Sequence, residues 1–489
     1  MRCVVTGSGV AGLAAALLLA RQGHDVTVVE ACRHAAPLLR GFTREGLHFD
    51  TGFHCGGGLH PGGALRRWLR ALGVEADLQD ISTTHSAVFC FADGSEYRLP
   101  SGVQAVTDAA ERQFPGTGHG MNAFLRRAEA ELSSSPYLNP TVRDAPGGAL
   151  QDGATLNERL DAAAFPPHLR AMLGSRCLLY GVFPSEASWR DFSLVAGPYF
   201  QSCGTWRGGG AALAEALLRA LREARVAVRL GRAVTGIEAD TATGVRGVLL
   251  GDGTRIACER CFFTGHPAQL ARLTPPGLLR PAYLHRIDDM PETSPALLLF
   301  AETRDTLRDD ESLYLLPSPQ AASSDAELFP SLEAEDPGIY VFCDRPAADG
   351  RRAVMAVSLL HGAGLPEGDP QPRPRDYLDW KRRAAEQARR AVERRVPRLR
   401  GAWRILDAAT PLTLRRWVYG GTGSLYGVRH HRAVMPLLPV TRVPGLFLAG
   451  QNALLPGVLG GIVSAALAVG FAFGHDAALK EFRECAENE

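Results

Sequence analysis

A glycine-rich turn near the start of the chain has the residue types and spacing to hold a diphosphate. The segment Gly7-Ser8-Gly9-Val10-Ala11-Gly12 follows an apolar run at 3–5 and precedes a helix-forming series at 13–21. In a strand–turn–helix unit of this kind, the first glycine permits a tight turn and the second lets backbone N–H groups approach a pyrophosphate. The third lets helix and strand pack closely, and the helix N-terminus faces the negative charges. The predicted cofactor contacts are therefore Gly7, Ser8, Gly9, Ala11 and Gly12.

An acidic residue follows at the point where such a unit binds a ribose. Residues 25–29 predict a second strand, and Glu30 comes directly after it. A carboxylate there accepts hydrogen bonds from the ribose hydroxyls of an adenosine, and its charge disfavours a 2′-phosphate. A lone GxGxxG is weak evidence. Strand, turn, helix and acid together predict a dinucleotide-binding βαβ unit rather than a coincidental turn.

A second glycine cluster lies near the other end of the chain. Residues 445–450 predict a strand that ends at Gly450, and the segment 456–461 opens an apolar helix. A glycine at a strand end permits close backbone contact, and a helix N-terminus stabilises negative charge on a reduced flavin. The two clusters together predict FAD, bound by residues from both ends of the chain.

The cysteines predict neither a metal site nor a disulfide scaffold. The ten cysteines are scattered, and the one CxxC, Cys258 to Cys261, has no second pair at zinc-site spacing. We expect no metal, and we place Cys258 at the end of a strand. Scattered thiols fit a reducing cytosol, and a strand predicted at 1–6 leaves no room for a signal peptide. The expected location is therefore cytoplasmic.

Composition indicates a folded protein without a strong net charge. Hydrophobic residues make up 46% and charged residues 21%, and 53 Lys plus Arg stand against 52 Asp plus Glu. No global field favours nucleic acid, so we do not expect it as a partner. A basic helix predicted over 377–395 leaves two interpretations open, peripheral membrane contact or a solvated charged face. The apolar stretch 453–473 contains glycines and a proline, which predicts a buried segment near the cofactor. The oligomeric state stays open.

The elements that position these segments form an interrupted α/β domain. A glycine triplet at 208–210 opens a helix predicted at 211–224, and residues 262–267 are expected to leave the sheet that follows. That sheet is predicted as a meander with strands at 226–230, 234–238, 245–250 and 255–258. The predicted fold class is α/β, with a discontinuous Rossmann-like FAD-binding domain at 1–75, 205–275 and 405–489. The inserted mixed α+β substrate-binding domain is predicted at 76–204 and 276–404.

Four blocks resemble the phytoene desaturase, carotenoid isomerase and retinol saturase (all-trans-retinol 13,14-reductase) family of flavoproteins. They are the segments 7–30, Phe49-Asp50-Thr51-Gly52-Phe53-His54, 208–237 with the later His266-Pro267, and 450–461. The Phe-Asp-Thr-Gly-x-His block and Ala449-Gly450-Gln451-Asn452 are more similar to the retinol saturase branch than to the carotene desaturases. The resemblance implies an FAD domain of the amine-oxidase and glutathione-reductase type.

The resemblance also implies roles for individual residues. Val234 should lend its backbone to the adenine, while the ribityl chain and flavin ring should lie along Gly450, Gln451, Val458 and Leu459. The chain departs from the family where Ala36-Pro37 replaces a paired glycine, and Arg40 or Gly41 is expected to substitute.

Catalytic candidates are few. His54, from the Phe-Asp-Thr-Gly-x-His block, is a candidate proton donor or acceptor near the flavin. An equally open alternative is that it only binds the loop backbone. Arg207 and Tyr426 are weaker candidates.

The family resemblance implies a redox enzyme that saturates or desaturates carbon–carbon bonds of a lipophilic conjugated substrate such as a retinoid, carotenoid or polyene. Three alternatives stay open: a redox-neutral cis-trans isomerase that uses reduced FAD, an amine-oxidase-like flavoenzyme, and a flavin-binding protein without turnover. The amine oxidase would need a lysine at the flavin, and none occurs between Met1 and Trp380.

Overall fold

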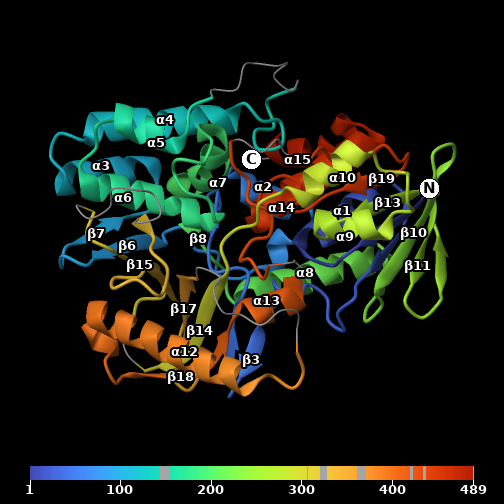
Figure 1. The fold of residues 1–489 in the computed structure, drawn as a ribbon. Coiled ribbons are helices and arrows are strands. Elements are labelled where there is room, and N and C mark those ends of the chain that lie inside the picture. Colours follow the sequence, from blue (N-terminus) through green and yellow to red (C-terminus); the bar gives the residue numbers. More distant parts are fainter. Residues whose placement is uncertain are drawn as a thin grey trace.

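Two sheets organise the protein (Figure 1). The computed structural model describes residues 1–143, 153–304, 307–319, 328–360, 370–418, 422–432 and 437–487. In the view of Figure 1, the N-terminal strand and the C-terminal helices lie on the right, and the larger sheet lies on the left. Segments from the two ends of the chain therefore meet in one half of the molecule.

The first sheet is parallel and has five strands in the order β19-β13-β1-β2-β9. Its strands are β1 (Arg2–Thr6), β2 (Asp25–Val29), β9 (Ala227–Arg229), β13 (Arg260–Phe263) and β19 (Leu446–Leu448). Apolar side chains of α1 (Val10–Arg21), α8 (Gly209–Glu223) and α14 (Gly457–Phe473) pack on one face. The other face packs against an antiparallel sheet of β10 (Val234–Asp240), β11 (Gly244–Leu250) and β12 (Arg255–Ala257), with α9 (Pro267–Leu273) and α10 (Pro281–Asp288). This three-layer arrangement confirms the predicted Rossmann-like α/β fold.

One strand of the predicted meander was misplaced, and one strand of the first sheet was missed. The segment 226–230 was expected in the meander, but β9 pairs in parallel with β2 at the edge of the first sheet. The segment 262–267 leaves the meander as expected, but its first residues complete β13, a strand of the first sheet between β1 and β19 that was not predicted. Both errors have one cause, because parallel partners lie far away in sequence and leave no local turn signal.

The second sheet has seven strands in the order β18-β14-β17-β16-β15-β6-β7. The strands are β6 (Ser86–Phe91), β7 (Glu96–Leu99), β14 (Ala296–Thr303), β15 (Glu311–Leu316), β16 (Ile339–Cys343), β17 (Arg352–Leu359) and β18 (Trp403–Ala409). One face packs against α3 (Val103–Gln113), α4 (Gly118–Ser133), α5 (Leu156–Ala162), α6 (Pro167–Gly174) and α7 (Trp189–Gln201). The opposite face packs against α12 (Arg375–Arg395). Successive strand residues point to opposite faces, which is why Leu297 and Leu299 meet α12 while Leu298 does not.

The predicted domain division stays a prediction. The five-stranded sheet takes its strands from the three segments assigned to the FAD domain, and β18 crosses the predicted boundary at 404 and 405. Small elements connect the two halves: β3 (Phe42–Arg44) with β4 (Leu47–Phe49), β5 (Gly56–Gly57) with β8 (Cys203–Gly204), and the helices α2 (Ala64–Ala71), α13 (Pro411–Val418) and α15 (His475–Glu487).

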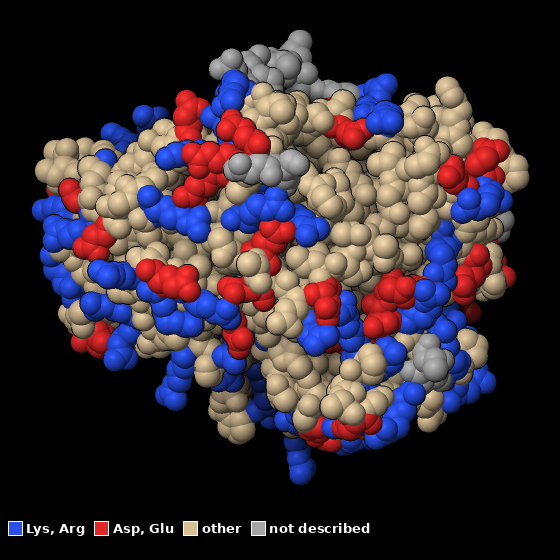
Figure 2. All heavy atoms as spheres, turned by 180° about the vertical axis from the view of Figure 1, so that it is seen from behind, with Lys and Arg blue, Asp and Glu red and all other residues tan. Residues whose placement is uncertain are grey.

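The two segments considered for membrane contact have different surroundings. Helix α14 is buried along most of its length, and among the described residues no helix is long and apolar enough to cross a bilayer. Several basic residues of α12 are ion-paired, including Arg389 with Glu386 and Glu393, and Arg395 with Asp336. Figure 2 shows basic and acidic side chains interspersed over the face opposite to Figure 1. Membrane contact by α12 stays a prediction.

Candidate active site

One large cavity extends from the first sheet to the second. Its volume is about 1820 Å³, and residues of α1, β2 and α14 line it together with residues of β14, β16 and β17. Pockets for one small ligand usually measure about 300–1,000 Å³. The cavity therefore has room for a large cofactor together with a substrate.

The three glycines of the N-terminal turn have distinct surroundings. Gly7 has a φ of +99°, and a Cβ there would lie 2.4 Å from Thr264 Oγ1. A Cβ on Gly12 would lie 2.0 Å from the Gly7 carbonyl oxygen, so only glycine lets α1 pack against this turn. A Cβ on Gly9 would meet no protein atom within 4 Å, and Gly9 lines the cavity. The space beside Gly9 fits a ligand that approaches the backbone, as the motif predicts.

Glu30 is held by the turn that it faces. Its Oε2 accepts hydrogen bonds from the backbone N–H and the hydroxyl of Ser8, both at 2.7 Å, and its Oε1 accepts the Cys32 N–H at 2.8 Å. Glu30 is 6% exposed and still lines the cavity. Because Oε1 accepts one hydrogen bond from the described residues, it keeps a lone pair for a ribose hydroxyl. Ser8 is fully buried, so its side chain serves the site by positioning Glu30.

Two helix N-termini face the cavity without side-chain caps. Helices α1 and α14 each lack a capping side chain and an acidic residue in the first turn. Gly461 lets the two helices approach closely, because a Cβ there would lie 2.7 Å from Val10 Cγ1. The exposed N–H groups and positive dipole ends of both helices favour an anionic ligand between them.

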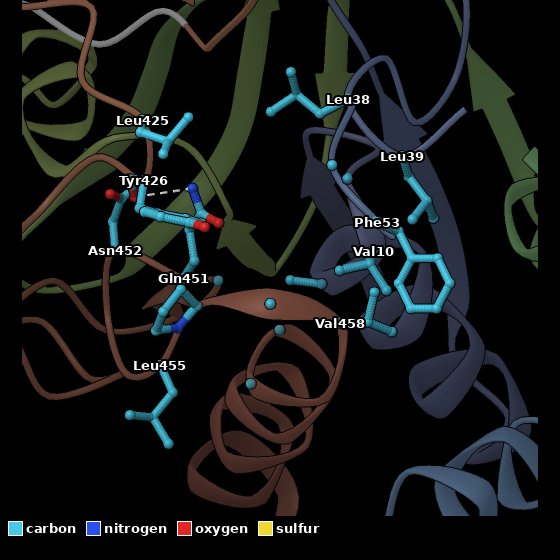
Figure 3. A pocket seen from close by; sticks show the side chains of 18 of the residues that line it. Val10, Leu38, Leu39, Phe53, Leu425, Tyr426, Gln451, Asn452, Leu455 and Val458 are labelled. Carbon is cyan, nitrogen blue, oxygen red and sulfur yellow. Dashed lines mark hydrogen bonds between the residues drawn. The ribbon is translucent and has the colours of Figure 1, made fainter. Parts of the chain in front are cut away.

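The predicted flavin-side residues line the same cavity. Gly450, with a φ of +101°, donates its N–H to Ser464 Oγ of α14 at 2.9 Å. The amide of Gln451 donates to the Tyr426 carbonyl at 3.0 Å, and Figure 3 shows this bond on the side of the cavity opposite Val10 and Val458. Leu459 also lines the cavity.

The remaining predicted cofactor residues fall at the margins. Val234 lines the cavity from β10. Arg40 and Gly41, the two residues considered as substitutes for the paired glycine, both line the cavity, and Arg40 is exposed. Contact of either with the cofactor stays a prediction. Ala11 lines the cavity, whereas Gly12 acts through the packing of α1.

The Phe49 to His54 block joins the two halves of the site. Asp50 Oδ1 accepts the Gly210 N–H at 3.0 Å and so binds the N-terminus of α8, while Thr51 Oγ1 donates to the Leu38 carbonyl at 2.7 Å. Gly57 permits close approach of α7, because a Cβ there would lie 2.5 Å from the Tyr199 nitrogen. The three consecutive glycines at 56–58 indicate that backbone approaches closely here, and the structure identifies α7 as the partner.

His54 lines the cavity, and its ring lies 5.2 Å from Phe342 and 6.2 Å from Tyr340 between centroids. Burial lowers the pKa of His54 to about 4, despite an opposing effect of Asp50. Its Nδ1 is buried and makes no hydrogen bond within the described part of the chain. The imidazole is therefore neutral near pH 7 and can accept or donate one proton.

The two weaker candidates differ. Arg207 is exposed and pairs with Asp80, and it is not among the cavity-lining residues. Tyr426 does line the cavity.

The far wall of the cavity was missed by sequence reasoning. Alternate residues of β14 and β17, namely Leu298, Phe300, Met355, Val357 and Leu359, point into the cavity. Tyr199, Tyr314 and Tyr340 line it as well, and so does Lys381, whose ammonium pairs with Asp407 at 3.5 Å. These strands are buried on both faces, so no alternation of polar and apolar residues marks the face that meets a ligand.

The cysteines lie mostly in the core. Cys258 and Cys261 are buried, and burial raises the pKa of the Cys258 thiol to about 12. Within the residues that the structure describes, no group of three or more His, Cys, Asp or Glu is placed to hold a metal ion.

These features fit FAD. The open space at Gly9, the oriented Glu30 carboxylate and two uncapped helix ends suit an adenosine diphosphate, and the segment 450–461 suits the flavin end. The fold and site thus define a flavoprotein with a dinucleotide-binding domain.

A sequence model of the flavin containing amine oxidoreductase family matches residues 10–469. The chain belongs to this family, and it is an FAD-dependent oxidoreductase.

Relatives support the same assignment. The chain is 24% identical to the all-trans-retinol 13,14-reductase of Homo sapiens, over 95% of this chain and 84% of that protein. It is 23% identical to a 4,4'-diapophytoene desaturase of Staphylococcus haemolyticus, over 70% of this chain and 71% of that protein.

Solved structures show the fold. An oxidoreductase from Methanosarcina mazei superposes with a TM-score of 0.66 at 14% identity, covering 95% of this chain and 99% of that one. A CLA-producing fatty acid isomerase from P. acnes gives a TM-score of 0.63 at 13% identity, covering 96% and 98%.

Proposed function

We propose that the protein transfers a hydride equivalent between FAD and a carbon–carbon bond of a lipophilic, conjugated substrate such as a retinoid, carotenoid or other polyene. When bound, FAD supplies two-electron chemistry at its flavin N5. The protein has to hold the substrate bond beside that atom and exclude water.

The apolar sheet wall of the cavity carries this proposal. Leu298, Phe300, Met355, Val357 and Leu359 are consecutive inward-pointing residues of two neighbouring strands. Together they form a surface that favours a hydrocarbon chain over a hydrated metabolite. The wall and the segment 450–461 line one continuous cavity, so a polyene packed on the wall has access to the flavin side.

The relatives support a reaction at carbon–carbon bonds. One is named as a retinol 13,14-reductase and the other as a diapophytoene desaturase, so the names cover both directions of hydrogen transfer. Both substrate names denote long, conjugated, lipophilic molecules, which agrees with the apolar wall.

The roles of individual residues follow from their positions. Glu30 binds the adenosine ribose, Gly9 and the α1 N-terminus bind the pyrophosphate, and Val234 lies along the adenine. Gly450, Gln451, Val458 and Leu459 lie along the flavin. The neutral His54 lines the part of the cavity that we assign to the substrate.

Product mass tests the proposal. Candidate retinoids and polyenes are incubated with the protein, once with oxidised FAD and once with reduced FAD, in the absence of oxygen. The expected product differs from the substrate by two hydrogens per bond. The Gly9→Val variant serves as the control without cofactor. An unchanged mass with altered double-bond geometry would instead indicate the isomerase, and ammonia released from an amine would overturn both.

A further inference from the structure

A second group is needed to complete a reaction of this type. If a hydride is added to one carbon of a double bond, the other carbon must receive a proton, and the reverse direction must remove one. An apolar cavity supplies little water for this step, so the proton has to come from a side chain on the cavity wall. This inference rests on the proposed function.

Five tyrosines line the cavity, namely Tyr137, Tyr199, Tyr314, Tyr340 and Tyr426. The Tyr137 hydroxyl is hydrogen-bonded to His475 Nδ1, but Tyr137 packs in the core of the first sheet and is not part of the second-sheet wall on which the substrate is proposed to pack. The hydroxyl partners of the other four separate them. The Tyr199 hydroxyl donates to the Cys55 carbonyl at 3.3 Å, which cannot return a proton. The Tyr314 hydroxyl accepts from Arg176 Nη1 at 3.3 Å, and a guanidinium stays protonated. Within the described residues, the hydrogen bonds of Tyr426 involve its main-chain N–H and carbonyl, which bind the side chains of Thr293 and Gln451. None of these three is joined to a group that exchanges protons.

Among these four, Tyr340 is the exception. Its hydroxyl lies 2.8 Å from Ser312 Oγ, and Ser312 Oγ lies 2.7 Å from His85 Nε2. Ser312 and His85 are 3% and 4% exposed, so solvent does not compete for these bonds. A serine hydroxyl both donates and accepts, and a neutral imidazole has one nitrogen of each kind. The chain can therefore carry a proton in either direction.

The two ends of this chain lie in different environments. Tyr340 faces the cavity and lies beside His54. His85 lies at the start of β6, where the adjacent Ser86 N–H binds the Asp310 carbonyl at 2.8 Å. The side chains of Asp309 and Asp310 are 38% and 41% exposed. The chain thus leads from the cavity toward a solvated acidic loop.

A buried cation is placed to stabilise charge on the tyrosines. Arg176 is 7% exposed, and its guanidinium lies 5.4 Å from the Tyr314 ring centroid. No carboxylate pairs with it in the part of the chain that the structure describes. The Tyr314 and Tyr340 rings lie 5.1 Å apart, so a transient phenolate at Tyr340 would form near an uncompensated positive charge.

We propose that Tyr340 is the catalytic acid and base of the protein, and that Ser312 and His85 form the relay that exchanges its proton. In the saturating direction, reduced FAD provides the hydride and its two electrons. The electron pair left on the second carbon takes the Tyr340 hydroxyl proton, so the O–H bond breaks and a C–H bond forms. The phenolate takes the Ser312 proton, and Ser312 takes the Nε2 proton of His85 as His85 Nδ1 gains a proton, so that the imidazole stays neutral. Nδ1 is buried and has no hydrogen-bond partner among the described residues, so the replacement proton has to reach it from the side of the Asp309 and Asp310 loop. Desaturation runs the same transfers backwards.

A single-turnover experiment with a matched control tests Tyr340. Reduced, FAD-loaded protein is mixed with a polyene that the wild-type protein saturates, and the rate of product formation is measured. Tyr340→Phe should bind FAD normally and lose roughly 100-fold or more in rate, the usual range for a lost general acid. Tyr426→Phe removes a hydroxyl from the same cavity and should lose much less. Equal rates for Tyr340→Phe and wild type, or a larger loss in Tyr426→Phe, would overturn the assignment. Wild-type turnover with an unaffected Tyr340→Phe leaves the proposed function intact.

A spectroscopic measurement, combined with the rate of product formation, tests the relay. Protein labelled with ¹³C at tyrosine Cζ is examined by NMR, and the Tyr340 resonance is identified by its loss in Tyr340→Phe. Ser312→Ala should shift this resonance and slow product formation, whereas Ser312→Thr keeps a hydroxyl and should restore both. If Ser312→Ala changes neither the Tyr340 resonance nor the rate of product formation, Tyr340 acts without the relay and the relay is refuted.

Discussion

Replacing Glu30 tests how the cofactor cradle is built. The Glu30 carboxylate accepts the Ser8 N–H, the Ser8 hydroxyl and the Cys32 N–H, all at 2.7–2.8 Å, and it is 6% exposed. Glu30→Ala leaves these buried donors without partners and removes the acceptor for the ribose. Losing the ribose bond alone should weaken FAD binding by about 1–3 kcal/mol, or roughly 5- to 150-fold in Kd.

Glu30→Gln is the matched control. It keeps the side-chain volume and one acceptor oxygen, but its amide nitrogen must face a second backbone N–H. Because each carboxylate oxygen accepts a backbone N–H in the wild-type protein, the amide cannot satisfy both. The expected order of FAD affinity is therefore wild type, then Gln, then Ala.

The assay is titration of the apoprotein with FAD, followed by quenching of flavin fluorescence. Thermal unfolding of each apoprotein is measured in parallel, so that a loss of affinity is separated from a loss of fold. Apoprotein with Glu30→Ala that folds normally and binds FAD within about twofold of wild type would refute the assigned role of Glu30.

Three further predictions follow from the same geometry. Gly9→Val should leave the apoprotein folded, because a Cβ at Gly9 meets no protein atom within 4 Å, yet it should abolish FAD binding. Glu186→Ala, which breaks an ion pair with Arg429, should retain FAD. Flavin absorbance after reconstitution of each variant distinguishes the two outcomes. Gly12→Ala should instead lower the free energy of unfolding by about 3 kcal/mol or more, measured by urea denaturation, because its Cβ would lie 2.0 Å from the Gly7 oxygen; an unchanged urea midpoint would contradict this packing. Burial lowers the pKa of His85 to about 4. Between about pH 6.5 and pH 4, His85 is therefore protonated in the unfolded chain but stays neutral in the folded protein. Stability is therefore full above pH 6.5 and falls toward pH 4, by about 2 kcal/mol between pH 7 and 5 for this residue, and His85→Gln should show a smaller loss over this interval than wild type.

The cofactor half of the site was predictable because its signals are local. The turn at Gly7–Gly12 and the acid at Glu30 lie within one βαβ unit, and each glycine has a steric reason that a short sequence window contains. Likewise, Gly450 and the start of α14 appear together in a single segment.

The substrate half could not be predicted in the same way. His85, Ser312 and Tyr340 lie on three different parts of the chain and meet only because β6, β15 and β16 are neighbours in one sheet. Strand order decides this contact, and strand order is a long-range property. For the same reason β9 was placed in the wrong sheet and β13 was missed.

Arg40 and Ser8 show an intermediate case. The sequence indicated both as cofactor residues, but only the structure shows that Ser8 is buried beneath Glu30 and that Arg40 is exposed at the cavity. The residue type suggested a polar role in each case, and the surroundings decided between positioning and direct contact.

The central claim is that FAD in this cavity exchanges two electrons with a carbon–carbon bond. The most direct test is an anaerobic titration in which protein-bound, fully reduced FAD is mixed with a candidate polyene while flavin absorbance and product mass are followed together. We expect one flavin to be reoxidised for each double bond reduced, with a product heavier by two hydrogens. For a desaturase, oxidised FAD is bleached as a product lighter by two hydrogens appears. Two results would contradict this proposal. One is a flavin that keeps its redox state while the polyene changes only its double-bond geometry, and the other is a flavin that changes its redox state only with amines.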